Sequence, residues 1–238
     1  MFSLLFAIIS LLYTTVGQAG GTAFLALMAF AALPPTQMRP TALALNIVVA
    51  TYSTWVFNRN KVIDWTMLRP LVLSSMPTAL AGGLIVLGEH IYRTLTGVVL
   101  LLAGAAMILR RGHAADRNRE TPLWGAVSVG AAIGLVSGLT GVGGGVFLAP
   151  TLIAMNWASP KQTAAVSAPF ILANSTVGLV GVLFTGQFPS LHLGLYAIAA
   201  LGGAIAGTAI GLKWLGQTAI SFILAAILLA AGVQLILG

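Results

Sequence analysis

The sequence GQAGG at residues 17–21 returns in related form as GVGGG at residues 141–145, each time inside a long apolar run. An apolar stretch of equal length follows each cluster, at residues 22–33 and 146–157. Glycine destabilises a helix by about 1 kcal/mol relative to alanine. Irregular backbone at membrane depth is tolerated only where protein buries it or a cavity adjoins it. Two matching breaks in two matching halves therefore indicate the binding site of a membrane transporter.

The composition excludes a soluble fold. Of the 238 residues, 58% are hydrophobic and only 6% are charged, against roughly 25% charged residues in soluble domains. The mean hydropathy is +1.01. Alternating segments of about ten residues, which a membrane β-barrel would show, are absent from the sequence. We therefore expect an all-α polytopic membrane protein, in which the basic residues behind the net charge of +7 lie in short loops and contact no nucleic acid.

The apolar sequence falls into two sets of four runs. Six runs fit the roughly 20 residues that a spanning helix needs, whereas the first and the fifth are longer and contain the glycine clusters. The runs are 2–33, 41–57, 66–88, 91–109, 123–157, 163–185, 191–212 and 217–237. We expect a first transmembrane repeat at residues 1–110, a polar basic linker at 111–122 and a second repeat at 123–238.

The two halves align in sequence. An offset of 124 places the first glycine cluster on the second, and after a shift of one residue PTQ at residues 35–37 meets PKQ at residues 160–162. Further on, Ala79 and Gly82 meet Ala204 and Gly207. These matches in one order indicate that the halves arose by duplication.

The orientation of each half in the membrane depends on whether the two broken runs cross it. If both cross the membrane, the basic residues divide seven to four between its faces. If both are re-entrant hairpins, each half has three crossings, the halves are inverted, and only Arg39 and Arg93 oppose the other nine basic residues. Cytoplasmic loops carry an excess of Lys and Arg, so the second arrangement is favoured. It places both termini outside the cytoplasm.

The glycine clusters are suited to an anion. After each break a helix restarts, at Thr22 and at Val146, and the first turn of a helix has unpaired N–H groups and about half a positive charge. Glycine lets a ligand approach the backbone closely. No Lys or Arg is expected at the membrane midplane, so amide donors would supply the remaining positive potential. The predicted substrate-binding residues are Gln18, Gly20, Gly21, Thr22, Asn46, Gly143, Gly144, Gly145, Ser167 and Asn174.

Two roles remain open for the polar side chains inside the runs. Asn46 and Asn174 can donate N–H groups to anionic oxygens, or they can form hydrogen bonds between helices. Hydroxyl groups on the same runs, among them that of Ser175, rank lower. Aromatic residues near the run ends, such as Tyr13 and Tyr92, are expected in interfacial belts without a role in the site.

Catalysis and cation transport are disfavoured. The four acidic residues lie in or near predicted loops, whereas proteins that bind cations or relay protons usually bury carboxylates in the membrane. The three histidines have no metal-binding or nucleophilic partner in the sequence, and the chain has no cysteine. We expect no catalytic residue, no metal and no cofactor, and hence no enzyme.

The sequence GVGGGVFLAP at residues 141–150, the PKQ turn at 160–162, Ser167 and the two-fold repeat of four runs resemble the sulfite exporter TauE/SafE family. In the first half Ala19 replaces a glycine and Ala26 stands where Pro150 falls, so the first break is expected to be less open. The resemblance covers the whole chain. It implies a permease of the inner membrane that moves sulfite, sulfonates or related small organic anions.

These observations predict a secondary transporter in a bacterial cytoplasmic membrane that exports a small sulfur-containing anion by alternating access. An anion channel, or a permease for small carboxylates, is the alternative. The expected partners are the anionic substrate and the lipid bilayer, and a homodimer is left open.

Overall fold

The protein is built from α-helices. A computed structural model describes residues 2–109, 121–213 and 218–237, and these ranges contain ten helices and no strand. In chain order the helices are α1 (Phe2–Thr15), α2 (Gly21–Phe30), α3 (Pro35–Arg59), α4 (Trp65–Leu84), α5 (Glu89–Leu109), α6 (Leu123–Thr140), α7 (Gly145–Ala154), α8 (Pro160–Phe184), α9 (Leu193–Lys213) and α10 (Thr218–Leu237). Most of the predicted basic linker, with Arg111, Arg117 and Arg119, lies outside the described residues, as does the preceding Arg110.

Four helical stretches are long and apolar enough to cross a membrane, as judged by length and composition within the described ranges. They are Pro35–Arg59, Leu123–Thr140, Lys161–Phe184 and Leu193–Ile210. The prediction of an all-α polytopic membrane protein is confirmed.

Both long apolar runs are broken at their glycine clusters. The first run forms α1 and α2, and the fifth forms α6 and α7. The second helix of each pair has ten residues and begins at Gly21 or Gly145, one residue before the predicted restart. Ten residues rise about 15 Å, which is half of the roughly 30 Å hydrocarbon core, so neither α2 nor α7 is long enough to span it.

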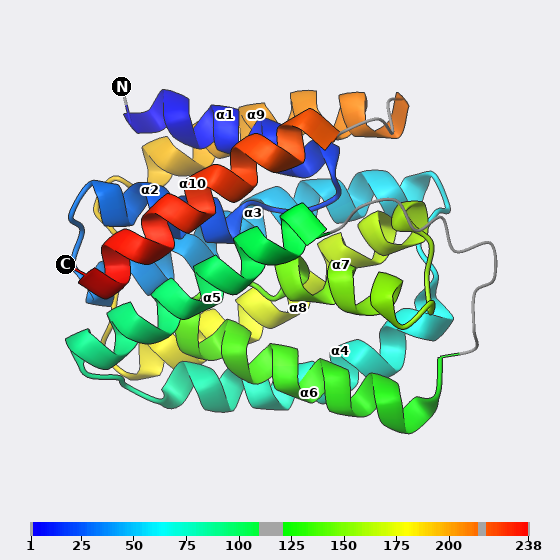
Figure 1. The fold of residues 1–238 in the computed structure, drawn as a ribbon, viewed down its shortest axis with the longest axis horizontal. Helices are drawn as coiled ribbons and strands as arrows, with labels where there is room; N and C mark the ends of the chain where they lie inside the picture. Colours follow the sequence, from blue (N-terminus) through cyan, green and yellow to red (C-terminus); the bar gives the residue numbers. More distant parts are fainter. Residues whose placement is uncertain (1, 110–120, 214–217, 238) are drawn as a thin grey trace.

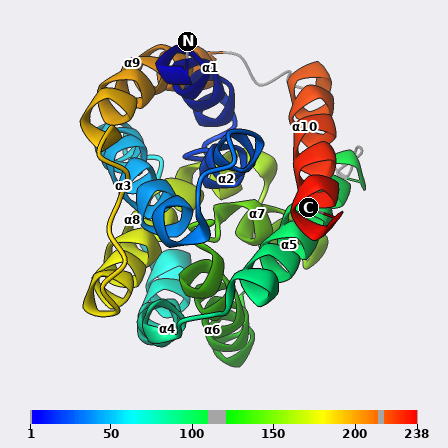
Figure 2. The same ribbon diagram turned by 90° about the vertical axis from the view of Figure 1, so that its left-hand side faces the viewer.

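The two short helices lie inside the molecule. Figure 2 shows α2 and α7 surrounded by the other helices, with α2 nearer the viewer and α7 behind it. In Figure 1 the chain runs away from the N-terminus along α1 and returns along α2, and both termini lie at the same end of the molecule. The pair α6 and α7 enters from the opposite end.

Four helices of the first half pack lengthwise against four of the second. Helix α1 lies along α9, α6 lies along α4, α5 lies along α10, and α3 lies along α8. Small residues allow the close approach. A Cβ atom at Gly134 would lie 2.5 Å from Oγ1 of Thr78, and a Cβ atom at Gly138 would overlap the carbonyl of Ala79. Glycines spaced four residues apart are typical of close helix contacts in membranes.

Each short helix is embedded in apolar side chains. Phe24 and Leu25 of α2 belong to one buried cluster, which also includes residues of α1, α3, α5, α9 and α10. Leu148 and Leu152 of α7 belong to a second buried cluster, which includes residues of α4, α6 and α8. This packing holds the N-terminal ends of α2 and α7 inside the protein.

Candidate functional site

The backbone at both breaks takes a conformation that favours glycine. The φ angles are +75° at Gly17 and +100° at Gly20 in the first break. They are +86°, +85° and +82° at Gly141, Gly143 and Gly144 in the second. A left-handed conformation costs a residue with a Cβ atom about 1–2 kcal/mol. Gly20 and Gly144, two of the predicted site residues, thus lie in the left-handed region.

Gly21 and Gly145 require glycine for a different reason, which is space. Each is the first residue of its short helix. A Cβ atom at Gly21 would lie 2.5 Å from Nδ2 of Asn46 and would overlap the carbonyl oxygen of Val142. A Cβ atom at Gly145 would lie 2.6 Å from Cγ1 of Ile171. Gly21 therefore lies directly against the second break, and the two breaks meet.

The N-termini of α2 and α7 are buried and have no side-chain cap. Their N-cap residues are Gly20 and Gly144, and neither end receives a capping hydrogen bond from a side chain. By contrast, Asp64 caps α4 and Ser159 forms a capping box on α8. The first-turn N–H groups of a helix carry its positive end. Two such ends therefore lie in the interior, and backbone groups of this kind bind anions.

Asn46 lies between the two breaks, one residue from the midpoint of the 25-residue helix α3. Its side chain is inaccessible to solvent. The Nδ2 group donates to the carbonyl of Val142 at 3.3 Å and to that of Gly141 at 3.5 Å. The Oδ1 atom has no hydrogen-bond partner within the described protein. The N–H groups of Asn46 thus join α3 to the second break, as the interhelical alternative predicts, and its oxygen remains an acceptor.

Asn174 has a different environment. It lies two residues from the midpoint of α8, its side chain is 0% exposed, and neither Oδ1 nor Nδ2 has a partner within the described protein. An unpaired buried polar group costs about 1–3 kcal/mol, so native structures rarely keep one without a reason. Asn174 therefore retains the full hydrogen-bonding capacity that a ligand could use.

The other predicted polar side chains are those of Thr22, Ser167 and Gln18, and all three are buried. The hydroxyl of Thr22 lies 2.9 Å from the Tyr13 hydroxyl. Ser167 lies beside Gly145, and its hydroxyl donates to the carbonyl of Thr163 at 2.7 Å within α8. The side chain of Gln18 is 4% exposed, inside the first break.

Arg39 lies in a helix beside the second break. The prediction that it lies in a loop is wrong. Proline is favoured at the first position of a helix, and α3 begins at Pro35, which puts Arg39 in its second turn with 1% exposure. Its guanidinium donates to the backbone carbonyls of Gly82, Gly83 and Gly138, and to that of Ile85. Its own backbone packs against Gly141, where a Cβ atom would lie 2.9 Å from the Arg39 carbonyl oxygen.

Two tyrosines are also buried beside the breaks, contrary to the prediction that they lie in interfacial belts. Tyr13 and Tyr92 are 1% and 3% exposed. Tyr13 bonds Thr22 in the first turn of α2, and the Tyr92 hydroxyl donates to the carbonyl of Thr140 at 3.0 Å, just before the second break. Each hydroxyl thereby finds the polar partner that burial requires.

The described acidic residues lie at helix starts. Asp64 is the N-cap of α4, and Glu89 is the first residue of α5. Within the described ranges, no group of three or more His, Asp or Glu residues could hold a metal ion. His90 and His192 are exposed.

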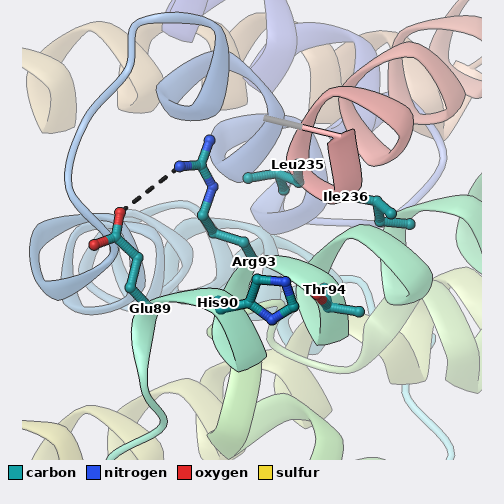
Figure 3. Close-up of a pocket in the computed structure, with 6 residues that line it drawn as sticks. All are labelled: Glu89, His90, Arg93, Thr94, Leu235 and Ile236. Atoms are coloured by element: carbon teal, nitrogen blue, oxygen red, sulfur yellow. Dashed lines mark ion pairs between the residues drawn. The ribbon is translucent and has the colours of Figure 1, made fainter.

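A cavity of about 270 Å³ lies elsewhere, where the start of α5 meets the end of α10. Figure 3 shows Glu89 and Arg93 pointing toward one another at this cavity, and they form a partly exposed ion pair at 3.7 Å. The cavity shares no residue with either break. We therefore place the candidate site at the breaks.

Comparisons with known proteins agree with this membrane architecture. The family described as "Sulfite exporter TauE/SafE" matches residues 2–235. The chain is 35% identical over 235 residues to the "Probable membrane transporter protein y4hK" of Sinorhizobium fredii, covering 97% of this chain and 95% of that protein. No solved structure matches the chain. The buried helix breaks thus lie in a membrane transporter, and the chain belongs to the sulfite exporter TauE/SafE family.

Proposed function

We propose that this protein is a secondary transporter that exports a small anion across a bacterial cytoplasmic membrane. Its cargo is sulfite, an organosulfonate or a related sulfur-containing anion. The observation that carries the proposal is the meeting of two buried, uncapped helix N-termini, those of α2 and α7, on either side of Asn46.

The electrostatics of this site suit an anion. Each helix N-terminus supplies roughly half a positive charge. Both described acidic residues, Asp64 and Glu89, lie at the starts of α4 and α5, outside the two breaks. A cation site in a membrane usually contains a buried carboxylate. The breaks instead offer N–H groups, hydroxyls and amides, which bind the oxygens of an oxyanion without covalent chemistry.

The arrangement of the halves supports alternating access. The first helix of each half packs on the fourth helix of the other half, as α1 on α9 and α6 on α4. The two broken segments enter from opposite ends of the molecule (Figure 1). We propose that the halves are inverted repeats and that one half rocks against the other around the breaks. Export of one net negative charge gains about 2.3 kcal/mol per 100 mV of inside-negative potential.

The cargo proposal rests on the family and on the donors. The family is named for sulfite export, whereas the name of the Sinorhizobium fredii relative gives a transporter without a substrate. Sulfite and sulfonates present three oxygens to hydrogen-bond donors, which matches a site built from N–H and O–H groups.

Transport assays in proteoliposomes test the proposal. We expect saturable flux of sulfite or a sulfonate that exceeds the flux of acetate, and that is lost in Gly144→Val while the variant still inserts. Flux that does not saturate, with ionic currents far above transporter rates, would identify a channel. Preference for acetate would identify a carboxylate permease, and saturable transport of a cation would reject an anion transporter.

A further inference from the structure

We infer that, where the two breaks meet, the groups that contact the anion directly belong to the second break: the side chains of Ser137, Asn174 and Ser175 and the N-terminus of α7. This inference rests on the proposed function and deepens it. Neither Ser137 nor Ser175 is among the residues that the sequence predicts for the site, although the Ser175 hydroxyl is a lower-ranked candidate.

The first observation is a set of unsatisfied polar groups. The hydroxyls of Ser137 and Ser175 and both amide atoms of Asn174 have no hydrogen-bond partner within the described protein. All three residues are 0% exposed. Serine in a helix commonly bonds a carbonyl one turn earlier, as Ser167 does here. Ser137 and Ser175 do not make that bond, so their hydroxyls are free to donate to a ligand.

The second observation is where these groups lie. A Cβ atom built at Gly143 would lie 3.1 Å from Oγ of Ser175, and one built at Gly144 would lie 3.6 Å from Cβ of Ser137. Ser137 therefore borders Gly144, the N-cap of α7, and Ser175 borders the preceding Gly143. Asn174 lies three residues after Ile171, whose side chain touches the Gly143 position. Residues three apart share a helix face, so Asn174 projects from the same side of α8.

The first break has a more apolar environment. A Cβ atom at Gly20 would meet the side chains of Phe24 and Ile9, and one at Gly17 would meet Ala164. The hydroxyl of Thr22, at the start of α2, is already bonded to Tyr13. Asn46 touches this break at Gly21, but its N–H groups are committed to the second break.

The sequence difference between the clusters fits this asymmetry. With the offset of 124, Ala19 occupies the position of Gly143. A Cβ atom at Gly143 would lie 2.6 Å from Nδ2 of Asn46 as well as close to Ser175. Glycine is therefore needed where polar side chains converge on the backbone, and alanine is accommodated where apolar ones do.

The chemistry of the second break specifies its ligand. Two hydroxyls, one amide N–H group and the first-turn N–H groups of α7 can donate to three oxygens of one small anion. A single helix N-terminus supplies about half a positive charge. This site suits a monoanion with a three-oxygen head group, such as hydrogen sulfite or an alkyl sulfonate, better than a dianion such as sulfate.

Binding measurements on purified wild-type protein and on Ser137→Ala, Ser175→Ala and Asn174→Ala test the inference, with sulfite, methanesulfonate and sulfate as probes. We expect each substitution to raise the Kd for sulfite or methanesulfonate by about tenfold or more, since losing one hydrogen bond to a charged group weakens binding by about that factor. Ser10→Ala is the matched control, because Ser10 is also buried with an unpaired hydroxyl but lies in α1. It should bind like the wild type.

Thermal stability separates binding from structure. Replacing an unpaired buried hydroxyl by a methyl group removes an unsatisfied group, so the apo Tm of Ser137→Ala and Ser175→Ala should stay equal to that of the wild type or rise. A lower apo Tm with unchanged Kd would show that the serines are structural and would overturn the inference. Equal weakening by Ser10→Ala would also overturn it. If the wild type binds none of the probes, the proposed function fails together with the inference.

Discussion

The guanidinium of Arg39 donates to the backbone carbonyl of Gly138 through Nε at 2.9 Å and through Nη2 at 2.6 Å. The same side chain donates to carbonyls at the end of α4, those of Gly82 and Gly83. Carbonyls in the last turn of a helix carry its negative end. The buried cation is thus stabilised by two helix C-termini, and it ties α3 to α4 and to the end of α6 next to the second break.

Removing this guanidinium should destabilise the protein. In Arg39→Met the four carbonyls lose their donors, and breaking a buried charged network typically costs about 3–5 kcal/mol. We expect a clearly lower Tm in detergent and reduced recovery of folded protein. Arg39→Lys should retain part of the stability, because an ammonium group keeps the charge and donates three hydrogen bonds. It should not retain all of it, because an ammonium group lacks the planar guanidinium that reaches both helix ends.

Arg93→Met is the control for Arg39→Met. Arg93 forms a partly exposed pair with the exposed Glu89 at 3.7 Å, and ion pairs at the surface contribute about 0–1 kcal/mol. A Tm for Arg39→Met equal to that of Arg93→Met would contradict the role given to the guanidinium.

A second prediction concerns the backbone of the second break. Gly144→Ala introduces a Cβ atom at a φ of +82° and places it 2.8 Å from Cγ2 of Ile133. We expect transport to fall at least tenfold, since the N-terminus of α7 must shift. Gly186 has a similar φ of +78° with nothing within 4 Å of the Cβ position, so Gly186→Ala carries the backbone cost alone. Transport that falls equally in both variants would show that strain, and not the site, is responsible.

The positions of the helix breaks could be predicted from the sequence because adjacent glycines inside an apolar run disfavour a continuous helix. The predicted restart at Thr22 differs from the observed start of α2 by one residue. The apolar runs also locate every long helix, although α3 begins at Pro35, six residues before the predicted run. Polar residues such as Gln37 lower the hydropathy of that first turn, so the apolar run does not include it.

The partners of buried polar groups could not be predicted, because they come from distant parts of the chain. Arg39 and Gly138 are 99 residues apart. No local sequence pattern shows that the guanidinium will be paired with backbone carbonyls and not with a carboxylate. Ser137 looks like an ordinary small residue of a membrane helix. Asn46 and Asn174 look alike in sequence, yet only Asn46 has carbonyls within reach of its N–H groups.

A third prediction tests the inverted arrangement of the halves. The chain has no cysteine, so single cysteines can be introduced without a background. Gln37 and Lys161 are exposed near the starts of α3 and α8, whereas Arg39 is buried and unsuitable for labelling. If the halves are inverted, Gln37→Cys should react with an impermeant maleimide from outside the cell, and Lys161→Cys only after the membrane is opened. Reaction of both from one face would reject the inversion.

The last prediction concerns Asn46, whose Nδ2 group joins α3 to the carbonyls of Gly141 and Val142. Asn46→Asp preserves size but removes both donors and places a carboxylate against two carbonyl oxygens, next to the proposed anion. At an effective dielectric of about 20, like charges about 4 Å apart repel by roughly 4 kcal/mol. We expect sulfite flux in proteoliposomes to fall by about a hundredfold or more in Asn46→Asp, and much less in Asn46→Ser, which keeps a neutral donor. Asn58→Asp makes the same change at an exposed position of α3 and should leave flux close to that of the wild type. Equal flux in Asn46→Asp and Asn58→Asp would show that Asn46 neither holds the second break nor lies near the transported charge.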